Sequence, residues 1–453
     1  MIVPASIFRQ YDIRGLVDAE LTSDLARAIG RACCTLGCER LGRPPVLAVG
    51  QDNRPSSDQL ARGLRAGIAE SGGTAVDVGV LPTPALYFAV QALLTDGGVQ
   101  VTGSHNPPEF NGFKLVLAGD ALHGEDLLRL RDIIDREDWP SGAGLETANA
   151  SILPRYREAI VARHHLRRPV RVVVDCGNGV GSLIAVSTLE ALGAEVVPLF
   201  CESDGRFPNH HPDPTVVENL RELQAEVRRS GAELGVAFDG DADRLGAVDE
   251  AGAVVFGDQL LVLFGRDAVR RFGPGTRVIF DVKCSDVLPQ ALAAAGARPE
   301  MWKTGHSLIK ARMKQLQAPL AGEMSGHMFF GGDWLGFDDA LFAAARLLEI
   351  VAAGPGGLAP LLADLPRTWV TPEIRVECPE DRKVRLVEEA TEYFESRYPI
   401  STIDGVRMTF PHGWGLIRAS NTQPILVLRF EARDPVSLAS YQGEVMSWLR
   451  QRL

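Results

Sequence analysis

The sequence predicts an α/β protein in which three similar domains are followed by a smaller α+β domain. Three observations support this fold class. The 453 residues are enough for several domains. One strand–helix–strand unit recurs three times at a spacing of about one domain. After residue 360 this unit gives way to short segments in which apolar and polar residues alternate.

The recurring unit begins with a run rich in β-branched residues that ends in polar turn residues. It is found at 43–54 (R-P-P-V-L-A-V-G-Q-D-N-R), 168–179 (R-P-V-R-V-V-V-D-C-G-N-G) and 275–286 (G-T-R-V-I-F-D-V-K-C-S-D). An alanine- and leucine-rich stretch, a glycine and a second strand-like run follow each of them. This order is typical of an α/β unit with a largely buried sheet.

The last domain has a different pattern, in which alternating segments predict an antiparallel sheet flanked by two helices. The segments lie at 374–378, 406–410 and 425–432, and the helices are expected at 380–397 and 435–452. The sequence P-H-G-W-G at 411–415 is typical of a turn. With a linker at 137–144 and a glycine-rich loop at 351–360, the expected domains are 1–146, 147–252, 253–365 and 366–453.

The composition limits the classes of partner. A hydrophobic content of 45% with 23% charged residues is ordinary for a folded globular protein. The net charge of -11 argues against binding to nucleic acid or to an anionic membrane, because both reward a basic surface. An anionic ligand would therefore need arginines and lysines concentrated in particular loops.

The cysteines indicate a reducing compartment. There are seven, an odd number, with no C-x-x-C spacing and no histidine pattern for zinc. Free thiols in the cytoplasm are the simplest interpretation. The N-terminus lacks a basic segment followed by a long apolar stretch, and no run of about 18 apolar residues occurs. We therefore expect neither secretion nor a membrane span.

Residues 101–114, V-T-G-S-H-N-P-P-E-F-N-G-F-K, form the first candidate for a functional loop. Glycine, asparagine and two prolines surround Ser104 and His105, and such residues favour conformations that helices and strands do not tolerate. Lys114 ends the segment. Two interpretations are open at this point: an ordinary turn, or a rigid loop that presents the Ser104 hydroxyl.

The second candidate is a cluster of carboxylates in E-L-G-V-A-F-D-G-D-A-D-R, residues 233–244. Asp239, Asp241 and Asp243 follow an apolar strand and alternate with small residues, so their side chains can converge on one point. Converging negative charges repel unless a cation lies among them, and oxygen ligands favour magnesium. Because such magnesium keeps positions for phosphate oxygens, a phosphoryl group on Ser104 would complete the site.

Two alternatives apply to this cluster. Acids at the first, third and fifth positions, with Glu250 at the twelfth, also occur in EF-hand calcium loops. However, Arg244 stands where that loop needs glycine, and the preceding segment is strand-like rather than helical. A solvated acidic turn is the second alternative.

Two further polar loops lie downstream. In A-G-E-M-S-G-H, Glu323 and Ser325 are spaced to bind neighbouring hydroxyls of a sugar, and His327 follows. In I-R-A-S-N-T-Q-P, Arg418 and the polar residues after it offer a fork of donors suited to phosphate. A polar turn and a hairpin turn are the respective alternatives.

Together the four stretches resemble the α-D-phosphohexomutase family, particularly its phosphomannomutase/phosphoglucomutase branch. The matching motifs follow in family order, one in each expected domain: T-G-S-H-N-P at 102–107, D-G-D-A-D-R at 239–244, G-E-M-S-G-H at 322–327 and R-A-S-N-T at 418–422. The resemblance covers essentially the whole chain. It implies four domains around a central cleft, three of them α/β, and it decides against the plain-turn interpretation of the first loop.

The resemblance also implies a role for each loop. Ser104 is the phosphoserine of the resting enzyme, and the three aspartates bind magnesium together with a phosphoseryl oxygen. Glu323 and Ser325 bind sugar hydroxyls. The loop for the phosphate that is not reacting consists of Arg418, Ser420, Asn421 and Thr422, with Gln423 where threonine is common in this branch. Further ligand contacts are expected from Tyr11, Arg14, Lys283, Lys303, His306 and His327.

The implied activity is a reversible mutase reaction that interconverts hexose 1-phosphate and hexose 6-phosphate through a hexose 1,6-bisphosphate. The residues expected to take part in catalysis are Ser104, His105, Lys114, Arg14 and Arg244. Met324 has no hydrogen-bonding capacity for an amine or acetamide, which favours glucose and mannose phosphates. The alternatives are phosphoglucosamine mutase, a magnesium-dependent sugar phosphatase and a non-catalytic sugar-phosphate sensor.

Overall fold

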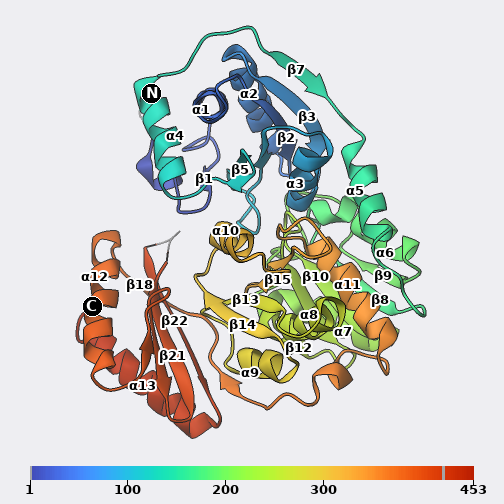
Figure 1. Ribbon diagram of the computed structural model, residues 1–453, viewed down its shortest axis with the longest axis vertical. Helices are drawn as coiled ribbons and strands as arrows, with labels where there is room; N and C mark the ends of the chain where they lie inside the picture. Colours follow the sequence, from blue (N-terminus) through green and yellow to red (C-terminus); the bar gives the residue numbers. More distant parts are fainter. Residues whose placement is uncertain (1–2, 421–423) are drawn as a thin grey trace.

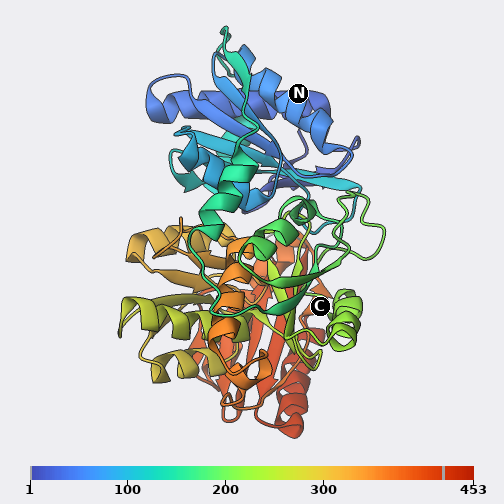
Figure 2. The ribbon, with the colours of Figure 1, turned by 90° about the vertical axis from the view of Figure 1, so that its right-hand side faces the viewer.

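The computed structural model describes residues 3–420 and 424–453, and within these residues the chain forms four sheets, each with its own helices (Figures 1 and 2). In Figure 1 the first domain lies at the top in blue, and the last lies at the lower left in red. The predicted four-domain α/β architecture is confirmed. None of the described helices is long and apolar enough to cross a bilayer.

The first domain has a mixed sheet in the order β1-β5-β4-β2-β3-β7, with β6 beside β5. Its strands are β1 (Ile13–Leu16), β2 (Val46–Gln51), β3 (Thr74–Val80), β4 (Gly97–Val101), β5 (Phe110–Leu117), β6 (Asp120–Ala121) and β7 (Leu145–Ala148). Its helices are α1 (Ser23–Leu41), α2 (Ser57–Glu70), α3 (Thr83–Ala92) and α4 (Glu125–Arg136). Because β7 pairs with β3, this sheet extends two residues past the expected boundary at 146.

The second and third domains repeat the plan with smaller sheets, ordered β12-β11-β10-β8-β9 and β14-β13-β15-β16. The second contains α5 (Ile152–Val161), β8 (Arg171–Asp175), α6 (Ala185–Ala191), β9 (Glu195–Leu199), α7 (Arg221–Ser230), β10 (Leu234–Phe238), β11 (Leu245–Asp249) and β12 (Val254–Val255). The third contains α8 (Gly257–Phe272), β13 (Arg277–Asp281), α9 (Val287–Ala294), β14 (Arg298–Trp302), α10 (His306–Leu316), β15 (Leu320–Gly322), β16 (Met328–Phe330) and α11 (Ala340–Ala353).

The repeated unit predicted from the sequence is present in all three domains. In each, the two strands of the unit pair in parallel: β2 with β3, β8 with β9, and β13 with β14. A helix joins the two strands each time. The second and third domains also share one apolar core, since α11 is buried on nearly every side and packs with residues of both. The same core also includes Leu81 and Leu86 of the first domain, so it joins all three α/β domains.

The last domain is an antiparallel sheet in the order β17-β22-β21-β20-β19, with β18 also beside β22. Its elements are β17 (Trp369–Val370), β18 (Ile374–Glu377), α12 (Glu380–Glu395), β19 (Ile400–Ser401), β20 (Val406–Phe410), β21 (Gly413–Ala419), β22 (Ile425–Ala432) and α13 (Pro435–Arg450). The turn expected at 411–415 was wrong in part. Gly413, Trp414 and Gly415 already belong to β21 and pair with β20, because Trp414 is buried against the third domain.

One buried carboxylate is expected to stabilise the shared core. Asp339 caps α11 and accepts hydrogen bonds from Phe342 N (2.9 Å), Tyr156 Oη (2.7 Å) and Trp334 Nε1 (2.8 Å). Asp339→Ala leaves these donors buried without an acceptor, so we expect a loss of about 3 kcal/mol or more and a lower Tm. Asp364→Ala removes only an exposed ion pair and should cost less than about 1 kcal/mol. Equal Tm changes in the two variants would contradict the prediction.

Candidate active site

Three of the four candidate loops lie next to one another, and hydrogen bonds join them across the domains. The Ser104 loop of the first domain bonds the aspartate loop of the second. The aspartate loop bonds the His327 loop of the third domain through Arg244. Tyr11 of the first domain donates from its hydroxyl to the carbonyl of Thr304 in the third (2.8 Å). A single site therefore draws residues from several domains.

Ser104 lies in the loop between β4 and β5 and is almost fully buried. Its backbone has a φ of 50°, a left-handed conformation that is uncommon outside glycine, so the surrounding structure must hold it. Its Oγ lies 3.1 Å from both Asp239 Oδ2 and His105 Nδ1. Burial, together with Arg244 and other nearby cations, lowers the pKa of His105 well below its ordinary value, which favours the neutral ring.

The three aspartates converge as predicted. They follow β10, are fully buried, and offer ligand atoms that all lie within 4.8 Å of one another. Backbone N–H groups of Asp243 (3.0 Å) and Arg244 (3.1 Å) hold Asp239 Oδ1 in place. Burial and the two neighbouring carboxylates raise the pKa of Asp239 well above its ordinary value.

The arrangement fits a hard divalent cation. Among the described residues, Oδ1 of Asp241 and Oδ1 of Asp243 have no hydrogen-bond donor although both atoms are buried. Unsatisfied carboxylate oxygens are costly in a protein interior unless a cation binds them. Three carboxylates without a soft ligand among them match the preference of magnesium. The preceding element is strand β10, which excludes the EF-hand alternative.

Lys114 belongs to the aspartate cluster rather than to the serine. Its Nζ lies 2.7 Å from Asp241 Oδ2 and also donates to Asp243. Burial alone would lower its pKa, but the two carboxylates outweigh burial and raise the pKa of Lys114 well above its ordinary value. The ammonium group therefore neutralises part of the negative charge of the cluster.

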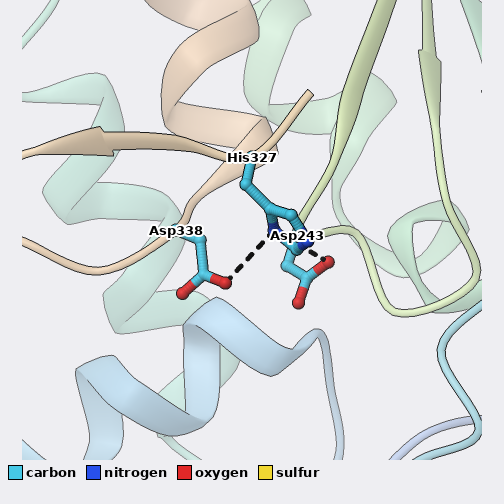
Figure 3. Close-up of side chains that lie close together, drawn as sticks. All are labelled: Asp243, His327 and Asp338. Atoms are coloured by element: carbon cyan, nitrogen blue, oxygen red, sulfur yellow. Dashed lines mark ion pairs between the residues drawn. The ribbon is translucent and has the colours of Figure 1, made fainter. Parts of the chain in front are cut away.

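Arg244 and His327 join the second and third domains. Arg244 Nε donates to His327 Nε2 (3.1 Å), and the two residues also form a backbone bridge. Because Nε2 accepts, a ring proton is assigned to Nδ1, which lies 3.2 Å from Asp338 Oδ2. Figure 3 shows Asp338 and Asp243 on either side of the ring. Lys310 offsets the charge of Asp338 at 2.9 Å.

The loop expected to bind sugar hydroxyls turns between β15 and β16. Glu323 is buried, accepts a hydrogen bond from Gly305 N, and receives the Ser325 hydroxyl at 3.3 Å. Burial raises the pKa of Glu323. His306 begins α10 and stacks on His327 with ring centroids 5.8 Å apart. The predicted sugar-binding residues thus lie directly beside the aspartate cluster.

The remaining predicted residues surround this centre. Arg14 donates to Asn106 Oδ1 in the serine loop at 2.9 Å. Arg418 is the last residue but one of β21, is buried, and donates to Asp404 at 3.1 Å. Lys283 lies 3.5 Å from Glu373 of the last domain. Lys303 is exposed and Ser420 is buried, whereas Asn421 and Thr422 lie outside the described residues.

Sequence reasoning missed three residues of the site. Thr83, at the start of α3, donates from its hydroxyl to Asp241, 158 residues away. Asp404 connects the third and fourth domains, because it accepts from both Thr304 N and Arg418. Asp338 precedes the cap residue of α11, and an acidic pair before a helix looks like ordinary capping. No local pattern distinguishes these residues from structural ones.

Comparisons with known proteins identify the family of the chain. The models of the phosphoglucomutase/phosphomannomutase α/β/α domains I, II and III and of its C-terminal domain match residues 5–141, 154–252, 256–369 and 373–447. A phosphomannomutase/phosphoglucomutase of Pseudomonas aeruginosa is 49% identical over 434 residues, which cover 95% of this chain and 92% of that protein. A phosphoglucomutase of Neisseria gonorrhoeae is 44% identical over 446 residues, covering 97% and 96%.

The fold is also known from solved structures. A phosphoglucomutase/phosphomannomutase family protein of Burkholderia thailandensis has a TM-score of 0.93 at 41% identity, covering 99% of this chain and 98% of that one. Fold and site together define a phosphoryl-transfer enzyme of the mutase class. The chain belongs to the phosphoglucomutase/phosphomannomutase family, and the predicted activity, that of a hexose phosphate mutase, is confirmed.

Proposed function

We propose that Ser104 is the residue that carries the transferable phosphoryl group, and that the chain converts glucose and mannose 1-phosphates to 6-phosphates and back. The observation that carries this proposal is the Ser104 hydroxyl, which is buried and points at the carboxylate cluster, 3.1 Å from Asp239. A serine beside such a cluster suits phosphoryl transfer better than acyl transfer, because the cluster serves to bind a cation.

The reaction has two mirrored steps. In the first, the free hydroxyl oxygen of the bound sugar phosphate attacks phosphorus; the bond from phosphorus to Ser104 Oγ breaks, the hydroxyl proton leaves to a base, and Oγ is released. The resulting hexose 1,6-bisphosphate reverses its orientation in the site without dissociating. In the second step Ser104 Oγ attacks the other phosphorus and its proton leaves to a base. The bond from that phosphorus to the sugar oxygen breaks and the sugar oxygen takes up a proton, so that the serine is phosphorylated again and the isomeric monophosphate is free to leave.

The aspartates would hold Mg²⁺ together with an oxygen of phosphoserine 104. When bound, the ion polarises the phosphoryl group and offsets its charge. Lys114 neutralises the carboxylates, and Arg244, which interacts electrostatically with Asp239 and Asp243, can stabilise phosphoryl charge. His105 and Arg14 orient the serine loop through Ser104 Oγ and Asn106.

The rest of the cleft would bind the sugar phosphate. Glu323 and Ser325 are assigned to the sugar hydroxyls. The distal phosphate is assigned to Arg418, Ser420, Asn421 and Thr422. Further contacts are assigned to Tyr11, Lys283, Lys303, His306 and His327. Because either phosphate must fit the distal site, that loop has to recognise phosphate itself, and an arginine fork suits this task.

A coupled assay tests the proposal. With catalytic glucose 1,6-bisphosphate and Mg²⁺, glucose and mannose 1-phosphates should be isomerised at least about tenfold faster than N-acetylglucosamine 1-phosphate, because the apolar Met324 offers no partner for an acetamide. Preference for the amino sugar would indicate a phosphoglucosamine mutase. Stoichiometric release of inorganic phosphate would indicate a phosphatase.

The compartment is also a proposal. All seven cysteines are free thiols, although Cys176 and Cys201 have their sulfur atoms 3.4 Å apart. Unpaired cysteines at such a distance support a reducing cytoplasm.

A further inference from the structure

Arg54, at the polar end of the first repeated unit, is the most completely hydrogen-bonded side chain around the serine loop. Its side chain is fully buried, and each of its five N–H groups has an acceptor. Nε donates to Asp52 Oδ2 at 3.1 Å. The other four N–H groups donate to backbone carbonyls at 2.6 to 3.0 Å, namely those of Ser104, Asn106, Pro107 and Phe110.

The serine loop needs such a partner. It lies between two strands without regular secondary structure of its own, and Pro107 and Pro108 offer no backbone N–H. Its carbonyls are turned inward, where unpaired acceptors would be costly. Ser104 itself has the left-handed backbone described above. The guanidinium group thus supplies the donors that fix this conformation.

The serine loop that Arg54 binds packs tightly against the aspartate loop. The Ser104 carbonyl that Arg54 binds packs directly on Gly240, where an added Cβ would lie only 2.3 Å from that oxygen. On its other side the guanidinium group rests on the ring of Phe207, 5.0 Å from the ring centroid. Gly103 leaves room for it, since a Cβ there would lie 2.5 Å from Arg54 Cζ. The serine loop is therefore closely packed on both sides.

We propose that Arg54 is a positioning residue for phosphoryl transfer, which holds the Ser104 Oγ in register with the aspartate cluster through the serine-loop backbone. The inference rests on the proposed phosphoserine chemistry. It does not make Arg54 a catalytic residue, because its donors are all engaged by Asp52 and the loop carbonyls. Lysine cannot replace it, since one ammonium group cannot span four carbonyls.

Arg54→Lys tests the inference. Because a misplacement of about 1 Å can cost about 100-fold, we expect kcat to fall about 100-fold while KM for glucose 1-phosphate stays within about threefold. The rate at which glucose 1,6-bisphosphate phosphorylates the dephosphorylated enzyme, followed by intact mass, should fall in parallel with kcat. A kcat within about threefold of wild type would overturn the inference.

Arg346→Lys is the matched control. Arg346 is equally buried, but it lies on α11 and pairs with Asp267, Asp333 and Glu349 far along the chain from the serine loop. It should lower Tm without changing kcat of the folded enzyme. If Arg54→Lys behaves in the same way, Arg54 is only structural and the inference fails.

A milder change covers the case in which the lysine variant does not fold. Phe207→Leu removes the aromatic face beneath the guanidinium group, and we expect a fall in kcat of about fivefold at unchanged KM, on the same argument of small misplacement. An unchanged kcat would overturn the inference. If the wild-type enzyme carries no phosphate on Ser104, the proposed function is contradicted. If the wild type is phosphorylated but Arg54→Lys is fully active, only the inference is contradicted.

Discussion

Ser104→Ala is expected to lower turnover about 10⁴-fold or more while sugar phosphate binds within about threefold of the wild-type affinity. The variant lacks the oxygen that accepts the phosphoryl group, and loss of a covalent carrier has effects of this size. The residues assigned to the sugar and the distal phosphate are untouched. Turnover is measured in the coupled assay, and binding of glucose 1-phosphate by calorimetry.

Ser151→Ala is the matched control, because Ser151 is exposed and its hydroxyl bonds only Asn149 nearby. It should keep full activity. After incubation with glucose 1,6-bisphosphate, wild type and the control should gain the mass of one phosphate, and Ser104→Ala should not. Normal turnover by Ser104→Ala would refute the covalent scheme, and a phosphate gained by that variant would place the carrier on another residue.

The sequence could predict the parts of the site that each lie in one short segment. The run of apolar residues before Asp239 predicts strand β10, and the alternation of small and acidic residues after it predicts convergence. The turn residues around Ser104 predict a rigid loop in the same way. These features depend on residues within about ten positions of one another, and the structure places them as expected.

The parts that could not be predicted depend on contacts between distant residues. Lys114 reaches Asp241 across 127 positions, and this contact places its ammonium group among the carboxylates. The bonds from Arg54 to the serine loop span 50 to 56 positions. Likewise, the alanine-rich pattern of α11 predicts a buried helix but cannot say that two domains share it. All three features depend on tertiary packing.

Removal of divalent cations is expected to lower turnover about 10³-fold, and Mg²⁺ should restore it. Without a cation, Lys114 and Arg244 offset only part of the charge of the three buried carboxylates, and two carboxylate oxygens have no partner among the described residues. Cation binding to a phosphoryl oxygen is worth several kcal/mol of transition-state stabilisation, which corresponds to a factor of about 10³ in rate. The measurement is turnover after treatment with EDTA and after titration with Mg²⁺.

A second readout separates binding of the cation from catalysis. A ligand that binds only the folded chain raises Tm, so Mg²⁺ should raise the Tm of the wild type. In Asp241→Asn the rise should be lost, because the amide removes one charged ligand while Thr83 still has an oxygen to bond. Asp204→Asn changes a partly exposed aspartate of the same domain and should leave the rise intact. A Tm rise of equal size in Asp241→Asn would mean that the cation binds elsewhere. Full activity of the wild type after chelation would mean that the carboxylate cluster works without a cation.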